Sequence, residues 1–378
     1  MRQISASIGL GGDFWDPRAE YFGQPLHMTR NLNVALLGYG RAAEHIHLPV
    51  LKELPGVDLT AIAEEDPIRR EQAQRLLPGA TVFESFETLL EQANIDAAVI
   101  TLPNLLHAPS AVAAYDKGLH VYLEKPLASA LESAHEIIDA WQAAGTVGMV
   151  GHNYRFGSMQ REARRLVAEG GIGQVVAVQT VFSTPPRDQP DWKRSRATGG
   201  GALLDLASHH LDLLPWMVQS SPVAISCHLR SVRSEDDTAA VQLELANGVP
   251  VQILASISAV EDDRIEIYGD AGRLVIDRYR SDQLEVHPAT LEGVRLLRVS
   301  NAVRSLTSPS YWKRKFRGGS PEVSFQEALR EFSHAAQQGR PAKPDLDDGL
   351  RCLALMEAAT RSEAESRTVR IEAEEETR

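Results

Sequence analysis

Asp205 and His209 are the residue pair in this sequence best suited to acid–base chemistry. They follow three consecutive glycines, Gly199 to Gly201, in a stretch whose pattern predicts a helix. Residues four apart lie on one face of a helix, and histidine is the side chain that takes up or releases a proton near neutral pH. His209 is therefore a candidate base for removing the hydroxyl proton of an alcohol while hydride leaves the carbon, with Asp205 positioning the substrate or tuning the base.

Lys125 offers the positive charge that such chemistry needs. It stands in Glu124-Lys125-Pro126, at the end of a strand predicted at 120–124. A lysine at this point can stabilise the negative charge that develops on the substrate oxygen. We expect Lys125, Asp205 and His209 to form a catalytic set.

Two plainer interpretations of Asp205 and His209 stay open. One is an ion pair on the helix surface, which contributes less than about 1 kcal/mol. The other is a metal site built with His210 and Asp212, but adjacent helical residues diverge and no third ligand group is evident in the sequence. We expect no bound metal.

A glycine-rich turn is the element expected to hold a cofactor near these residues. The strand predicted at 34–37 leads into it, and a helix is expected after it. Gly38 permits the tight turn, Gly40 lets a pyrophosphate approach the backbone, and Ala43 lets the helix pack on the strand. The same spacing also occurs in ordinary tight turns, so neighbouring elements must decide. The turn consists of Gly38, Tyr39, Gly40, Arg41, Ala42 and Ala43.

An acidic residue follows at the distance that a dinucleotide site requires. Glu64 ends the next predicted strand, 59–63, about twenty residues after the turn. Its carboxylate can accept hydrogen bonds from ribose hydroxyls and repel a 2′-phosphate, which favours NAD over NADP. Arg41, Arg69 and Arg70 lie nearby in the sequence and could bind a phosphate, so NADP remains possible. A solvated strand end is the alternative interpretation of Glu64.

Two more predicted strands, 96–101 and 120–124, end at the same edge of a sheet. In an open α/β sheet, ligands bind beyond the carboxyl ends of the strands. His107, in the loop after the first of these strands, is expected to shape the nicotinamide side of the cleft. The expected cofactor-binding residues are those of the glycine turn together with Glu64, Thr101, Pro103, Asn104, His107, Glu124 and Lys125.

After residue 151 the pattern changes to strands that follow one another with few helices between them. Asn247-Gly248 is a hairpin signal between two of these strands. Such a succession predicts an α+β domain with a large, mainly antiparallel open sheet.

The motifs resemble those of the Gfo/Idh/MocA family, the sugar and polyol dehydrogenases typified by glucose–fructose oxidoreductase and myo-inositol dehydrogenase. They follow the family's order over roughly residues 32–372. The motifs that carry the resemblance are the glycine turn, Thr101-Leu-Pro-Asn-Leu-Leu-His107, Glu124-Lys-Pro126, Gly151-His-Asn-Tyr-Arg-Phe156, Gly199-Gly-Gly-Ala-Leu-Leu-Asp205 and Tyr268-Gly-Asp-Ala-Gly272.

The resemblance implies an NAD(P)-dependent oxidoreductase. Such an enzyme transfers hydride between nicotinamide C4 and a secondary alcohol or ketone of a sugar, polyol or related metabolite, with the same Lys, Asp and His set. It also implies a homodimer or homotetramer formed through the C-terminal sheet. Two rival functions stay open: a sensor that binds dinucleotide and sugar without turnover, and an enzyme that cleaves glycosides with bound NAD and no net redox change.

Several residues beyond the catalytic set are expected to line a substrate pocket. Asn153, Tyr154 and Arg155 follow the last strand of the first domain, at the hinge. Trp192 and Lys193 precede the glycine run, where the resemblance implies an aromatic and basic pair suited to a sugar; a solvated loop is the alternative. The expected substrate-binding residues are Lys125, Asn153, Tyr154, Arg155, Trp192, Lys193, Asp205 and His209.

The fold class is therefore α/β, with an N-terminal Rossmann domain and a C-terminal α+β domain. We expect residues 1–30 to be a poorly ordered extension, with Met28 as an alternative start of translation, and 31–151 to bind NAD(P). Residues 152–370 are expected to form the substrate-binding and oligomerisation domain, whose C-terminal helices return toward the first domain.

Composition limits the partners and the compartment. The net charge of -12 argues against a nucleic-acid partner, and no apolar run is long enough to span a membrane. The sequence has only 2 cysteines, which suits a reducing compartment, so we expect a cytoplasmic protein.

Overall fold

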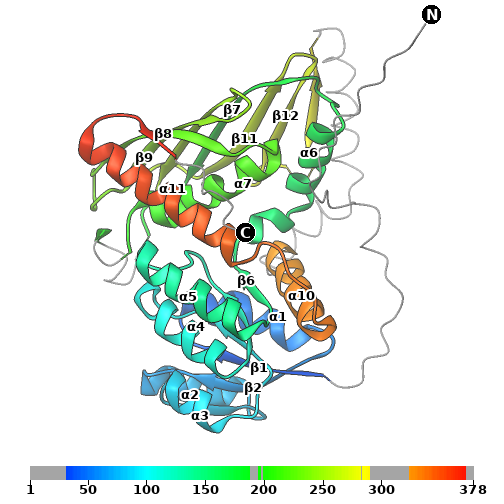
Figure 1. Ribbon diagram of the computed structural model, residues 1–378, viewed down its shortest axis with the longest axis vertical. Helices are drawn as coiled ribbons and strands as arrows, with labels where there is room; N and C mark the ends of the chain where they lie inside the picture. The colour runs from blue at the N-terminus through cyan, green and yellow to red at the C-terminus, as the bar shows by residue number, and fades with distance from the viewer. Residues whose placement is uncertain (1–30, 188–194, 197–198, 282, 290–322, 372–378) are drawn as a thin grey trace, which may run out of the picture. The chain divides into compact units, whose positions relative to one another are not determined.

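The computed structural model describes residues 31–187, 195–196, 199–281, 283–289 and 323–371. Its elements are drawn in Figure 1. The predicted residues Trp192 and Lys193, and the expected extension at 1–30, lie outside this described part of the chain. None of the described helices combines the length and the apolarity that a membrane span requires.

The first half of the chain forms a six-stranded parallel sheet in the order β3-β2-β1-β4-β5-β6. Every neighbouring pair is parallel. The chain enters at β1 and the order reverses between β1 and β4, so a crevice opens beyond the carboxyl ends of these two strands. The strands are β1 Leu32–Leu37, β2 Val57–Ala63, β3 Thr81–Phe83, β4 Ala97–Ile100, β5 His120–Leu123 and β6 Gly148–Val150.

Helices cover this sheet, and local sequence signals mark several of their ends. Asp66 caps α2 by accepting hydrogen bonds from the N–H groups of Ile68 and Arg69. Ser85 caps α3 in the same way, and α5 ends at Gly145 with a positive φ of 62°. The helices are α1 Leu48–Glu53, α2 Pro67–Leu76, α3 Phe86–Gln92, α4 His107–Asp116 and α5 Leu131–Ala144.

The second half forms an eight-stranded sheet in the order β13-β12-β11-β7-β10-β9-β8-β14. Its neighbouring strands are antiparallel except β7 and β10, which run parallel. The predicted α/β fold class, with a parallel Rossmann sheet and a mainly antiparallel second sheet, is therefore confirmed. The strands are β7 Val175–Ser183, β8 Pro222–Arg230, β9 Thr238–Leu245, β10 Pro250–Ser256, β11 Asp262–Gly269, β12 Gly272–Asp277, β13 Glu285–Pro288 and β14 Val369–Arg370.

One face of the second sheet is buried. Buried and exposed residues alternate strictly along β9 and most of β10, as expected when only one face meets helices. Helices α7 (Ser208–Val218) and α11 (Leu346–Glu365) share the core that this face forms, and Figure 1 shows both on the same side of the sheet. The alternation along these strands thus sets which face of the second sheet is exposed.

Two late helices also contact the first sheet and its helices. In α10 (Val323–Gln338), Leu329 and Phe332 are buried in the core that includes β1 and β5 residues. Glu357 of α11 accepts a hydrogen bond from the N–H of Leu131, at the start of α5, at 3.0 Å. Residues far apart in sequence therefore hold the segments around the crevice together.

Candidate active site

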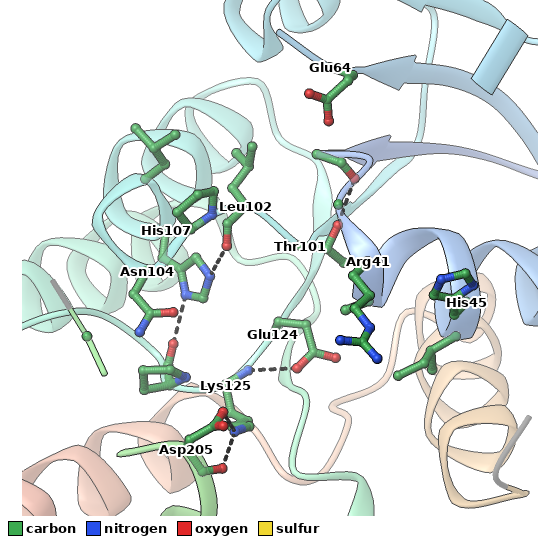
Figure 2. Close-up of a pocket in the computed structure, with 18 of the residues that line it drawn as sticks. Arg41, His45, Glu64, Thr101, Leu102, Asn104, His107, Glu124, Lys125 and Asp205 are labelled. Atoms are coloured by element: carbon green, nitrogen blue, oxygen red, sulfur yellow. Dashed lines mark hydrogen bonds and ion pairs between the residues drawn. The ribbon is translucent and has the colours of Figure 1, made fainter. Parts of the chain in front are cut away.

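A cavity of about 1000 Å³ lies beyond the carboxyl ends of the first sheet and extends to the segment that begins α7. It brings together most of the residues predicted from sequence, and Figure 2 shows ten of its lining residues by name. The predicted residues on its wall are Gly38, Gly40, Arg41, Ala42, Glu64, Thr101, Pro103, Asn104, His107, Glu124, Lys125, Asn153, Asp205 and His209. Tyr39, Ala43, Tyr154 and Arg155 are not among its lining residues.

The glycine turn has the geometry that a dinucleotide fold needs. Gly38 has φ of 91°, and a Cβ there would stand 3.0 Å from Cδ2 and 3.2 Å from the N of Leu102. A Cβ on Gly40 would meet nothing within 4 Å. Thr101 fixes the turn from β4, since its hydroxyl donates to the Gly38 carbonyl at 2.8 Å. The turn is therefore closed against the sheet at Gly38 and open to the cavity at Gly40, where a pyrophosphate can approach.

Glu64 is held at one end of the cavity by donors on three sides. Its Oε2 accepts the backbone N–H of Tyr39 at 2.8 Å, and Tyr39 is buried and does not line the cavity. Its Oε1 accepts Nη2 of Arg69 at 2.8 Å and the N–H of Asp66 at 2.9 Å. The solvated strand end considered from the sequence is wrong, because Glu64 is only 6% exposed.

His107 joins the ends of β4 and β5. Its Nδ1 lies 2.8 Å from the carbonyl oxygen of Pro126 and its Nε2 lies 2.9 Å from that of Leu102. Burial lowers the pKa of His107, although both carbonyls favour the charged ring. The ring shapes the cavity wall by fixing two backbone segments, as Figure 2 shows.

Glu124 is oriented from behind by His47. Nε2 of the fully buried His47 lies 2.7 Å from Oε1 of Glu124, while Oε2 accepts the N–H of Lys125 at 3.1 Å. Burial alone would raise the pKa of Glu124, but the hydrogen bond with His47 lowers it below its usual range. Phe325 and Tyr122 pack edge-on against the His47 ring, so His47 both fills the core and orients Glu124.

Lys125 meets the segment that carries the other candidate catalytic residues. Its Nζ donates to the main-chain oxygen of Asp205 at 2.8 Å and lies 3.8 Å from Oδ1 of the same residue. Figure 2 shows the two residues next to each other, joined by dashed lines. Asp205 lies in a five-residue π-helix, Leu203–Ala207, that leads into α7, and both it and His209 line the cavity. The predicted set of Lys125, Asp205 and His209 therefore shares one wall.

The ring of His209 is stacked on Tyr154. Their centroids are 4.4 Å apart and their planes differ by 19°. The hydroxyl of Tyr154 donates to Asp263 of β11 at 3.2 Å, and the guanidinium of Arg278 lies 3.9 Å from the centre of its ring. Tyr154 thus supports His209 from outside the cavity. The adjacent His210 points into the second sheet, where its Nδ1 lies 2.9 Å from the hydroxyl of Thr180.

Arg155 is directed into a buried ion-pair network. It donates through Nε and Nη2 to both carboxylate oxygens of Asp212, at 2.9 and 2.6 Å, and its Nη1 lies 3.3 Å from Oδ1 of Asp348. Burial alone would lower the pKa of Arg155, but Asp212 and Asp348 raise it above its usual range. Asp212 therefore joins α7 to Arg155.

Some lining residues carry no motif in the sequence. Phe325 arrives from α10, and its apolar spacing with Leu329 marks it only as a core residue. Arg187 lies at the end of the described segment after β7 and reaches Glu261 at 3.3 Å. In the described part of the chain, no group of three or more His, Cys, Asp or Glu side chains is placed to hold a metal ion.

Comparison with known proteins agrees with this arrangement. The profile described as "Oxidoreductase family, NAD-binding Rossmann fold" matches residues 32–152, and the GFO/IDH/MocA C-terminal domain matches residues 160–275. The dTDP-3,4-didehydro-2,6-dideoxy-alpha-D-glucose 3-reductase of Streptomyces violaceoruber is 30% identical over 255 residues, covering 66% of this chain and 74% of that protein. The chain belongs to the Gfo/Idh/MocA family of oxidoreductases.

Other Gfo/Idh/MocA proteins match over nearly the whole chain. The myo-inositol 2-dehydrogenase of Thermotoga maritima is 25% identical, covering 90% of this chain and 99% of that protein. A crystal structure of aldose-aldose oxidoreductase from Caulobacter crescentus, complexed with glycerol, superposes with a TM-score of 0.75 at 26% identity, covering 90% of this chain and 100% of that one. The family resemblance and the NAD-binding oxidoreductase class read from the motifs are thereby confirmed.

The cavity wall fits the cofactor of the Gfo/Idh/MocA family. Gly40 leaves space beside a helix start, where free N–H groups favour an anion. Glu64 stands at the end of β2, where a ribose hydroxyl is expected. Lys125 and His209 line the same cavity. These residues would hold NAD across the ends of the strands.

Proposed function

We propose that this enzyme transfers hydride between nicotinamide C4 and a secondary alcohol or ketone of a sugar, polyol or related metabolite. The observation that supports it most is the shared cavity wall of Lys125, Asp205 and His209, reached from the same space as the glycine turn. The names of two relatives, a myo-inositol 2-dehydrogenase and an aldose-aldose oxidoreductase, support the substrate class.

Each member of this set has one role in the proposal. Bound NAD supplies the hydride acceptor at C4. His209 takes the hydroxyl proton in oxidation and returns it in reduction. Lys125 donates a hydrogen bond to the substrate oxygen and stabilises its developing charge, and its hydrogen bond to the Asp205 carbonyl directs Nζ to that place. The Asp205 carboxylate orients the substrate beside them.

The cofactor residues in the proposal are those predicted from sequence. The glycine turn holds the pyrophosphate, Glu64 the adenosine ribose, and the wall from Thr101 to His107 the nicotinamide half. NAD is the preferred cofactor, because the buried Glu64 carboxylate accepts hydroxyl donors and disfavours a phosphate.

Asn153 and the pair Trp192 and Lys193 remain proposed substrate ligands. Asn153 lines the cavity, and its amide donates to the hydroxyl of Ser324 at 2.9 Å, which fixes its orientation. For Tyr154 and Arg155 the proposal changes, because both support α7 from outside the cavity. They act on the substrate only through His209 and its helix.

We also propose a role for each domain, a homo-oligomeric assembly and a cytoplasmic location. Residues 31–151 bind the cofactor, and 152–370 bind substrate and form a homodimer or homotetramer through the second sheet. The exposed face of that sheet supports this, since Leu254, 44% exposed, lies between Val181 and Ala240. The unpaired state of Cys227 and Cys352 supports a cytoplasmic location.

A panel of sugars and polyols, each offered with NAD+ and with NADP+, tests the proposed function. The expected result is NADH formation with at least one member of the panel. Protein that purifies with NAD, cleaves glycosides and releases no NADH would contradict it in favour of the glycoside-cleaving class. Tight binding of dinucleotide with no turnover across the panel would contradict it in favour of a sensor.

A further inference from the structure

The carboxylate that faces the adenosine end of the cavity is already paired with a cation. Oε1 of Glu64 accepts both Nε and Nη2 of Arg69, at 3.1 and 2.8 Å. Glu64 is buried, whereas the Arg69 side chain is 50% exposed, and both line the cavity. The ribose site therefore presents a neutral pair, and the repulsion of a 2′-phosphate expected from Glu64 alone is reduced.

The two carboxylate oxygens of Glu64 accept hydrogen bonds from different donors. Oε1 already accepts three N–H groups, from Arg69 twice and from Asp66 once. Oε2 accepts only the N–H of Tyr39 among the described contacts, which leaves room for a ribose hydroxyl. Glu64 can thus bind NAD+ without losing its contact with Arg69.

Three arginines on α2 are distinguished by what they contact. Arg70 donates to the carbonyl oxygens of Glu64 and Glu65, at 2.9 and 2.6 Å, and does not line the cavity. Arg75 forms an exposed pair with Glu71. Arg69 alone of the three combines a place on the cavity wall with a guanidinium that presents N–H donors near Glu64.

Arg41 is a poorer candidate for the same role. It lines the cavity, but Figure 2 shows its side chain extending away from Glu64, toward the part of the wall that holds Glu124. The arginine within the glycine turn is therefore not the one that contacts Glu64.

We propose that Arg69 is a specificity-determining residue that screens Glu64 and receives a 2′-phosphate, so that NADP+ binds as a second and weaker cofactor. The inference rests on the proposed function, in which this cavity holds a dinucleotide. Arginine suits the role because its planar fork can bond carboxylate and phosphate in turn. NAD+ remains the tighter ligand, because Oε2 of Glu64 can accept a ribose hydroxyl and Glu65 adds a second carboxylate to the same wall.

Calorimetric titration of the full-length protein with NAD+ and NADP+ tests the proposal. In Arg69→Ala, we expect the ratio of the Kd for NADP+ to the Kd for NAD+ to rise about tenfold or more, since a charge-assisted contact is lost and Glu64 is unscreened. In Glu64→Gln, the ratio should fall. Arg75→Ala, on the exposed face of the same helix, should leave the ratio unchanged.

Adenosine fragments locate the effect. Arg69→Ala should raise the Kd for adenosine 2′,5′-bisphosphate and leave the Kd for AMP within about threefold of wild type. A threefold change is smaller than the loss of one charge-assisted hydrogen bond would cause. An unchanged NADP+ to NAD+ ratio in Arg69→Ala, or wild-type protein that binds NAD+ but no NADP+, would overturn the role of Arg69 and leave the proposed function standing. Wild-type protein that binds neither dinucleotide would overturn both.

Discussion

Lys125 Nζ donates a hydrogen bond to the main-chain oxygen of Asp205 at 2.8 Å, joining the end of β5 to the segment that begins α7. The two residues are 80 apart in the sequence. The carboxylate of Asp205 also lies near this ammonium group, with Oδ1 3.8 Å from the same Nζ. This contact fixes the position of the Lys125 ammonium group relative to Asp205.

The two glycines of the turn should respond differently to the same substitution. Gly38→Ala places a Cβ 3.0 Å from Leu102 at a φ of 91°, so we expect a loss of about 1–3 kcal/mol in the free energy of unfolding. Gly40→Ala meets no atom within 4 Å and should keep the wild-type melting temperature. It should weaken NAD+ about tenfold or more, because the methyl group occupies the pyrophosphate approach. Wild-type NAD+ affinity in Gly40→Ala would refute this placement of the pyrophosphate.

We expect turnover to depend on the aromatic ring of Tyr154 more than on its hydroxyl. Tyr154→Leu removes the surface on which His209 is stacked, and we expect turnover to fall about tenfold or more while the Kd for NAD+ stays near wild type. Tyr154→Phe keeps the stacked ring and loses only the hydroxyl bond to Asp263, so most turnover should remain. Equal losses in the two variants would show that the hydroxyl, not the stacking, supports His209.

Removal of the buried cation Arg155 should destabilise the protein strongly. Arg155→Met leaves the carboxylates of Asp212 and Asp348 buried without their shared partner, which costs about 3–5 kcal/mol. Arg165→Met is the matched control, since Arg165 lies on the nearby α6, Ser158–Ala168, and the ion pairs it forms are exposed, so its loss should change the stability little. Urea unfolding at neutral pH measures both. Similar midpoints for the two variants would be incompatible with a buried network.

The same network should make stability depend on acid. Burial alone would raise the pKa of Asp348, but Arg155, Lys343 and Arg351 lower it well below its usual range. A carboxylate with a lowered pKa in the folded protein stabilises above its unfolded pKa of about 3.9, and this stabilisation is lost as the pH falls through the folded value. The difference in unfolding free energy between wild type and Asp348→Asn should therefore be largest near pH 7 and shrink below about pH 4. A difference that grows on acidification would contradict a lowered pKa of Asp348 in the folded protein.

The sequence was sufficient for the features that depend on local pattern. Period-two apolar residues predict the strands of the second sheet, and the glycine turn with Glu64 at the next strand end predicts the cofactor side. The spacing of Asp205 and His209 also predicts that they meet one cavity, even though the helix begins with a π-helical segment.

What the sequence could not predict are contacts set by packing between distant elements. Phe325 reaches the cavity from a helix whose apolar pattern indicates only a core face. Arg155 follows the hinge, and its direction depends on where Asp212 and Asp348 are brought by α7 and α11. Glu64 and Arg69 are five residues apart, but whether Arg69 neutralises Glu64 depends on the angle at which α2 leaves β2.

The most direct test of the proposed function compares turnover and cofactor binding in Lys125→Met and His209→Asn. With a sugar or polyol that the wild type oxidises, we expect NADH formation to fall by about 100-fold or more in each variant, because each loses a group that acts in the transition state. The Kd for NAD+, measured by titration, should stay within about threefold of wild type, since the glycine turn and Glu64 are intact. Near-wild-type turnover in either variant would contradict the roles assigned to these residues.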